Sequence, residues 1–266
     1  MRENSFIDAY YEQAWSYIAL SISPQEEERI RETLSLIPED CSSILDVGCG
    51  DGRITNRLLS QYRQVVGLES SREALRYVRA QKILGSVDSL PFPDGSFDLV
   101  LCCEVLEHLP FKVYPRAIEE IERVAAKYIV VTVPNNEDLK RSSVTCPHCG
   151  CVFNVSRHVR SFDRVRLQRL FSQFSLQNLL SCLSGKVYPA FLLNVAKTIK
   201  LLPDTPFPAT ALCPQCGYSH LLMGEASPRA NASKDSLSVR FLRPIARRLM
   251  PTQKRGGWLM ALYRRG

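Results

Sequence analysis

Residues 43–53 read S-I-L-D-V-G-C-G-D-G-R, and this stretch decides the fold. Its apolar first half is typical of a buried strand. The glycines that follow allow the positive φ and the close ligand approach of a nucleotide-binding turn. The dinucleotide fingerprint G-x-G-x-x-G needs a third glycine where this chain has Arg53. Asp46 would also repel a pyrophosphate, so the turn favours a positively charged cofactor over a dinucleotide. The alternative is an ordinary tight turn between a strand and a helix.

Two runs carry a resemblance to a known family. D-V-G-C-G-D-G at residues 46–52 resembles motif I of the class I S-adenosylmethionine-dependent methyltransferases, whose cofactor carries a sulfonium and an ammonium group. D-S-L-P-F-P-D-G-S-F-D at residues 88–98 resembles the quinone and small-molecule members. The resemblance covers residues 43–134. It implies an α/β fold: a doubly wound, Rossmann-like, seven-stranded sheet with an antiparallel last strand.

The same resemblance implies a set of cofactor contacts. Glu69, at the end of a strand expected over 64–70, would accept hydrogen bonds from both ribose hydroxyls. Asp88 would accept one from the adenine amino group, and Cys103 would touch the methionine part. The implied cofactor-binding residues are Asp46, Gly48, Cys49, Gly50, Glu69, Ser70, Asp88, Ser89, Leu90 and Cys103.

Glu104, Glu107 and His108 form the run E-V-L-E-H. On a helical turn, positions i, i+3 and i+4 share one face, so these side chains are expected to converge. The run resembles the metal-binding E-x-x-E-H motif of ubiquinone O-methyltransferases and of small-RNA 2′-O-methyltransferases. That implies a Mg²⁺ or Mn²⁺ site with His158 as a further candidate ligand. The alternative is that Glu107 caps or pairs on the helix and His108 shapes the acceptor pocket, as a catalytic base.

Two copies of C-P-x-C-G occur in the second half of the chain. Cys146 with Cys149, and Cys213 with Cys216, have the spacing of two zinc knuckles that complete one tetrahedral structural Zn²⁺ site. Cys151 and His158 are alternative ligands, but each would break the matched pairing. Redox C-x-x-C chemistry is disfavoured because neither copy opens a helix in a βαβ context.

Four segments are expected along the chain. Residues 1–40 form an N-terminal lid or helical segment that includes an aromatic helix over 6–20, and residues 41–140 form the cofactor-binding core. Residues 141–235 form a zinc-ribbon insertion that caps the acceptor site and includes one core helix, one core strand and an apolar helix over 187–202. Residues 236–266 hold a basic helix over 238–250 and the final strand.

Composition and charge indicate the general class of protein, its expected location and the kind of partner that its basic C-terminal segment could bind. The chain has 266 residues, 45% hydrophobic and 23% charged, which indicates a soluble globular protein. No run reaches the ~18 apolar residues of a membrane span, and the N-terminus has no signal-peptide core. With ten cysteines, six of them outside metal-like spacing, a reducing cytoplasm is the expected location. Residues 229–266 carry ten basic residues and one acid, which suits RNA, an anionic membrane surface or plain solvation.

The sequence therefore predicts a methyltransferase, and two classes of methyl acceptor, small molecules and RNA, remain open. A small-molecule acceptor, methylated on oxygen, is favoured by residues 88–98 and by the apolar segment. RNA, methylated for example on a ribose 2′-oxygen, is favoured by the zinc ribbon, the basic tail and the E-x-x-E-H run. The third alternative is a non-catalytic cofactor-binding or zinc-scaffold protein. The sequence does not set the oligomeric state.

Overall fold

The computed structural model describes residues 15, 22–187, 207–208, 211–220 and 253–266. The helix expected over 6–20, apart from Trp15, and the basic helix expected over 238–250 lie outside the described residues, as does the apolar run beyond Val187. The chain divides into two compact units. Unit 1 comprises Met1–Leu139, His158–Leu183 and Gly256–Gly266, and unit 2 comprises Lys140–Arg157 and Ser184–Arg255.

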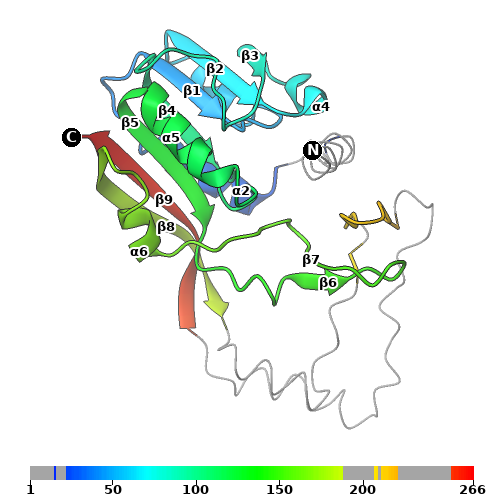
Figure 1. Cartoon of the computed structure of the whole chain (residues 1–266). Helices are drawn as coiled ribbons and strands as arrows, with labels where there is room; N and C mark the ends of the chain where they lie inside the picture. The colour runs from blue at the N-terminus through cyan, green and yellow to red at the C-terminus, as the bar shows by residue number, and fades with distance from the viewer. Residues whose placement is uncertain (1–14, 16–21, 188–206, 209–210, 221–252) are drawn as a thin grey trace. The chain divides into compact units, whose positions relative to one another are not determined.

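Unit 1 is built on a seven-stranded sheet with the order β3-β2-β1-β4-β5-β9-β8 (Figure 1). Its first five strands pair in parallel, whereas β9 pairs antiparallel with β5. The predicted sheet with its antiparallel last strand is therefore confirmed. The strands are β1 (Ser43–Val47), β2 (Gln64–Glu69), β3 (Gln81–Leu84), β4 (Phe97–Cys103), β5 (Ala125–Pro134), β8 (Phe174–Val187) and β9 (Gln253–Arg265).

Apolar side chains of the strands alternate between the two faces of this sheet, as the two-residue period of a strand requires. Leu45 and Val47 of β1 join one buried cluster, and Ile44 joins another. The first cluster includes residues of α5 (Tyr114–Val124) and α6 (Arg164–Gln168), and the second includes residues of α2 (Pro24–Leu34), α3 (Thr55–Leu58) and α4 (Arg72–Leu75). The sheet thus lies between two helical layers, which is why its central strands are apolar on both faces.

Three helices are shorter than the sequence pattern predicts. The sequence predicts helices over 54–62, 71–80 and 163–174, but α3, α4 and α6 each form little more than one turn. The chain beyond α3 and α4 turns through i→i+3 backbone hydrogen bonds, such as those from Gln61 to Leu58 and from Val78 to Leu75. Such bonds tighten the last turns into 3₁₀ geometry and end the α-helix. By contrast, the sequence predicts a helix that starts at Pro24 with Ser23 as its N-cap, and α2 begins there, with the Ser23 hydroxyl accepting from the Glu26 amide.

Unit 2 has little core of its own in its described part. Strands β6 (Ser143–Thr145) and β7 (Val152–Asn154) form an antiparallel pair, and Cys146, Cys213 and Tyr218 form a small buried cluster. A unit with so little apolar burial is expected to need a metal or another staple to be stable. None of the helices in the described residues has the length and hydropathy to cross a lipid bilayer.

Candidate functional site

The glycine turn that follows β1 brings the backbone against neighbouring side chains. Gly48 and Gly50 have φ of 70° and 54°, which only glycine adopts without strain. A Cβ on Gly48 would lie 2.4 Å from Cγ2 of Val105, and one on Gly50 would lie 2.7 Å from the Trp15 ring. The amides of Gly48 and Cys49 both donate to the Leu68 carbonyl, at 2.7 and 3.1 Å. These bonds tie the turn to the carboxyl end of β2.

Glu69 ends β2 with its carboxylate beside this turn. One oxygen accepts from the Gly50 amide at 3.0 Å, and the other accepts from the amides of Ser70 at 2.7 Å and Ser71 at 3.0 Å. Backbone donors therefore fix the orientation of this carboxylate, and the residue as a whole has an exposed fraction of only 9%. Glu69 lines a cavity of about 260 Å³ together with Trp15, Gly48, Ser70 and Val105.

Asp46 is buried beside the glycine turn. It accepts a 2.6 Å hydrogen bond from the Thr55 hydroxyl. Burial raises the pKa of Asp46 to about 7, and the charge of Glu69 adds to this rise. Asp46 lines a second cavity, of about 240 Å³, which shares Trp15, Gly48 and Glu104 with the first. Two adjoining cavities with carboxylates in their walls are thus suited to an elongated ligand that carries positive charge.

Most of the predicted cofactor residues line these cavities, but three do not. Asp46, Gly48, Cys49, Gly50, Glu69, Ser70 and Cys103 are in the walls of one or both. Asp88, Ser89 and Leu90 are in neither, although the preceding Val87 is. Asp88 accepts from the Ser86 hydroxyl, and the Leu90 amide donates to Glu120 at 2.6 Å. The adenine role of residues 88–90 stays a prediction.

The E-x-x-E-H run does not lie on a helix, and that part of the expectation is wrong. Glu104 has a left-handed backbone with φ of 58°, so the chain leaves β4 through a sharp turn. Its carboxylate accepts from the Trp258 ring nitrogen at 2.7 Å and from the Thr132 hydroxyl at 3.3 Å. Glu104 is therefore held by β9 and β5, at the wall that the two cavities share.

Glu107 and His108 nevertheless meet His158, as the candidate ligand set requires. One potential ligand atom from each of the three lies within 4.8 Å of the others. Glu107 is 1% exposed, and neither of its carboxylate oxygens has a hydrogen-bond partner in the described part of the chain. Burial, reinforced by the charge of Glu104, raises the pKa of Glu107 well above its usual value. A buried carboxyl group of this kind is suited to a cation.

The chain after residue 157 holds this cluster in place. The Val159 amide donates to the Glu107 carbonyl at 2.8 Å, and Nη1 of Arg160 donates to the Leu106 carbonyl at 2.7 Å. Nδ1 of His158 is hydrogen bonded to the Glu137 carboxylate. A carboxylate on the second ring nitrogen is the usual support for a metal-binding histidine. The sequence analysis missed Glu137 because only the fold places it beside His158.

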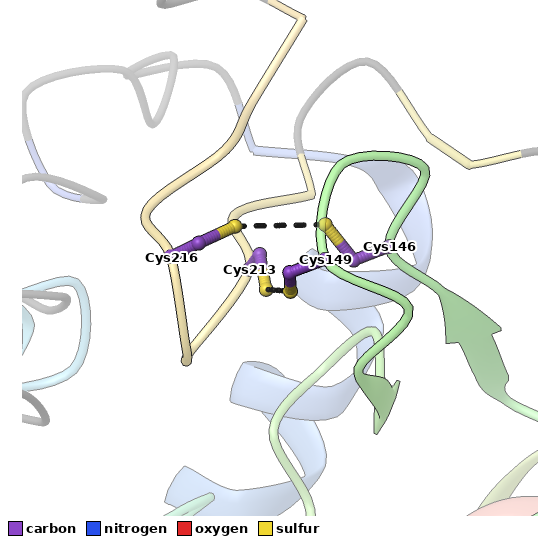
Figure 2. A group of neighbouring side chains, drawn as sticks. All are labelled: Cys146, Cys149, Cys213 and Cys216. Carbon is purple, nitrogen blue, oxygen red and sulfur yellow. Dashed lines mark hydrogen bonds between the residues drawn. The ribbon is translucent and has the colours of Figure 1, made fainter.

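The four predicted zinc ligands come together in unit 2, as Figure 2 shows. The sulfur atoms of Cys146 and Cys216 are 3.7 Å apart, and those of Cys149 and Cys213 are 3.6 Å apart. In a tetrahedral site with Zn–S bonds of about 2.3 Å, sulfur atoms are separated by about 3.8 Å. The cysteine cluster therefore has nearly the dimensions of a Cys₄ zinc site.

The two knuckles have the same backbone geometry. Gly150 and Gly217 have φ of 74° and 70°, and their amides donate to the carbonyls of Cys146 and Cys213, at 3.0 Å each. The amide of each first cysteine also bonds the carbonyl that follows its glycine, at 2.8 Å in one copy and 2.9 Å in the other. Burial raises the pKa of Cys213, but the backbone amides of Cys216 and Gln215 and the thiols of Cys146 and Cys149 together outweigh burial, and the pKa is lowered to about 7.

Most of the residues that line the two cavities lie in a segment that matches a known domain. Residues 45–128 match the family model described as "Methyltransferase domain". An uncharacterized methyltransferase of Schizosaccharomyces pombe is 37% identical over 156 residues, covering 55% of this chain and 54% of that relative. The ubiquinone biosynthesis O-methyltransferase of Albidiferax ferrireducens is 31% identical over 86 residues, covering 28% of this chain and 34% of that relative.

A solved structure with the same fold is the 1,6-didemethyltoxoflavin-N1-methyltransferase of Burkholderia thailandensis, with bound S-adenosylhomocysteine. It superposes with a TM-score of 0.53 at 13% identity, and the match covers 98% of this chain and 88% of that one. The chain spans about half or less of the length of the curated relatives above. The fold is that of the class I methyltransferases, and residues 45–128 are similar to a methyltransferase domain.

Proposed function

We propose that this protein transfers the methyl group of S-adenosylmethionine to an oxygen atom of a small-molecule acceptor. The observation that carries the proposal is the pair of adjoining cavities at the glycine turn, with Asp46 in one wall and Glu69 in the other. Glu69 would accept from the ribose hydroxyls, and Asp46 and Glu104 would offset the positive charge of the donor. The relatives with O-methyltransferase names support oxygen as the acceptor atom.

The chain's own residues would mainly align and desolvate the reactants. In the reaction the bond from sulfur to the methyl carbon breaks, the bond from that carbon to the acceptor oxygen forms, and the hydroxyl proton is lost. Val105, Leu109 and Val113 give the larger cavity apolar walls that exclude water from the methyl group. His108 lines the same cavity and would take the hydroxyl proton if no metal is bound.

The pKa of Asp46 makes donor binding depend on pH. A carboxyl group with a pKa of about 7 gains its charge as the pH rises through 7, and a cation binds the charged form. The affinity of the wild type for S-adenosylmethionine is therefore expected to rise about tenfold between roughly pH 6 and pH 8. The measurement is titration calorimetry across this window. Asp46→Asn should bind more weakly at the upper end, and an equal slope in this variant and the wild type would contradict the assignment.

Glu107, His108 and His158 also fit a divalent metal such as Mg²⁺ or Mn²⁺. The support is the buried Glu107 carboxylate without a hydrogen-bond partner in the described residues, together with the Glu137 carboxylate on His158. Such an ion would supply Lewis-acid activation of the acceptor hydroxyl. Glu104 is the candidate fourth ligand, although its two oxygens already accept from Trp258 and Thr132.

Glu107→Gln is expected to abolish Mn²⁺ binding at this site, because an amide lacks the charge that offsets the metal's. Electron paramagnetic resonance titration with Mn²⁺ measures this, with Glu119→Gln on the exposed part of α5 as the matched control. Glu107→Gln should also be at least as stable as the wild type without metal, since it removes a buried acid. Full activity after EDTA treatment that leaves the zinc in place would reject the metal and leave His108 as the base.

We further propose that the four-cysteine cluster holds a structural Zn²⁺ ion. The sulfur separations of 3.6 and 3.7 Å and the matched knuckle turns support it. With four thiolates the site has no open position, so we assign the ion no catalytic role. The proposed placement of this module as a cap on the acceptor site stays a prediction, as do the segment boundaries.

A methyl-transfer assay tests the proposed function. The protein is incubated with tritium-labelled S-adenosylmethionine and a cell extract that has been separated into RNA and small-molecule pools. We expect label in the small-molecule pool, in a form stable to mild alkali, as an aryl or alkyl ether is. Label confined to the RNA pool would contradict the small-molecule acceptor and would identify RNA as the substrate. Most of the basic tail that favours RNA lies outside the described residues.

A further inference from the structure

Arg29 is a buried cation in the wall of the cavity that holds Asp46. Its exposed fraction is 9%, and it lines this cavity together with Asp46, Gly50 and Glu104. In the described part of the chain its only ion pair is a long one, 3.9 Å from Nη2 to Glu26. Its Nη1 has no hydrogen-bond partner there. Burying a guanidinium to nine-tenths with so weak an ion pair costs free energy, unless an anion binds to it and offsets its charge.

Glu26 does not satisfy this need, because another arginine holds it more closely. Nη1 of Arg53 lies 2.6 Å from the same Glu26 oxygen, and Nε of Arg53 lies 2.8 Å from Asp51. These three side chains form a tighter network, at the rim of the same cavity. Arg29 is therefore not closely paired with Glu26. Its charge acts on the acids of the cavity, because it lowers the pKa of Asp46 and of Glu104 against the larger effect of burial.

The fold holds Arg29 firmly at this place. The next residue, Ile30, is fully buried in the core beneath α2, and the Thr33 hydroxyl donates to the Arg29 carbonyl at 2.8 Å. The helix is capped one and a half turns earlier by Ser23. The guanidinium is thus carried by a part of α2 that is fixed by both packing and hydrogen bonds. It is a preorganised site for an anion.

We propose that Arg29 binds the carboxylate of the amino-acid end of the methyl donor. This inference rests on the proposed function and assigns a residue to the one negative group of that cofactor. The amino-acid end is a zwitterion: its ammonium and the sulfonium suit Asp46 and Glu104, and its carboxylate suits a guanidinium, which can bind it through two parallel hydrogen bonds. The competing role for Arg29, to offset the charges of these acids, would not distinguish ligands that have a carboxylate from those that lack one.

The test compares two ligands that share the adenosine and the ammonium group and differ only in the carboxylate. They are S-adenosylhomocysteine, which carries the carboxylate, and its decarboxylated analogue, which lacks it. Calorimetry with Arg29→Met should show binding of S-adenosylhomocysteine weakened by about 10- to 100-fold and binding of the decarboxylated analogue weakened by less than about twofold. Arg31→Met is the matched control, since Arg31 is on the same helix with its side chain 70% exposed, and it should leave both affinities unchanged.

The other possible results of this experiment also test the role of Arg29. Equal weakening of both ligands in Arg29→Met, or no weakening of either, would overturn it while the proposed function stands. Failure of the wild type to bind S-adenosylhomocysteine would overturn the proposed function and the inference together. If Arg29→Met does not fold, Arg29→Lys replaces it. The ammonium keeps the charge but loses the fork geometry, so a several-fold loss confined to S-adenosylhomocysteine is then expected, and an unchanged affinity would count against the proposal.

Discussion

Glu69→Gln is expected to weaken binding of S-adenosylmethionine by about 10- to 100-fold. Hydrogen bonds to a charged group are worth about 1.5–3 kcal/mol, and 1.4 kcal/mol is tenfold in Kd. The carboxylate is held beside the cavity by the amides of Gly50, Ser70 and Ser71, so its oxygens are oriented before a ligand arrives. The glutamine has the same shape, but it lacks the charge and turns one acceptor into a donor.

Titration calorimetry at fixed pH measures this change, and a thermal unfolding scan checks that the variant folds. Glu27→Gln is the matched control, because Glu27 is on α2 with its side chain 54% exposed and pairs only with Arg57 in the described residues. It should leave the Kd unchanged. A folded Glu69→Gln variant with wild-type affinity would remove Glu69 from the cofactor site.

The double variant Cys146→Ser, Cys213→Ser is expected to lose one equivalent of zinc and the fold of unit 2. Structural zinc contributes about 10–16 kcal/mol of apparent binding free energy in small zinc domains. Without the metal, the described part of unit 2 would be stabilised only by the β6–β7 strand pair and a small buried cluster, which do not replace that free energy. Elemental analysis measures the metal, and limited proteolysis within residues 140–157 measures the fold.

Cys151→Ser is the control for this experiment, since Cys151 adjoins the cluster without belonging to it. It should keep the metal. Binding of S-adenosylhomocysteine should survive in the double variant, because the described residues that line both cavities belong to unit 1. An unchanged zinc content in the double variant would reject the Cys₄ site.

Local patterns in the sequence predicted the features that local chemistry determines. The glycine turn followed from the spacing of Gly48, Gly50 and Gly52, because each needs positive φ, and each has it. The two knuckles followed from a five-residue motif that fixes its own turn, so their pairing could be expected although the cysteines lie far apart in sequence. The start of α2 followed from the Ser23 cap.

Features that depend on tertiary contacts could not be predicted from the sequence. The spacing of Glu104, Glu107 and His108 suggested a helix, but Glu104 is left-handed and is held by Trp258, 154 residues away. Nothing in the sequence placed Glu137 beside His158. Arg29 could not be distinguished from Arg31, the other arginine of α2, because only packing decides which one is buried.

A crystal structure of the protein grown with S-adenosylmethionine or its demethylated product tests the central claim most directly. We predict the cofactor across the glycine turn, with its ribose hydroxyls on Glu69 and its sulfur near Asp46 and Glu104. Cavities that stay empty at saturating cofactor, or that take up a dinucleotide instead, would contradict the claim that these acids hold a cationic methyl donor.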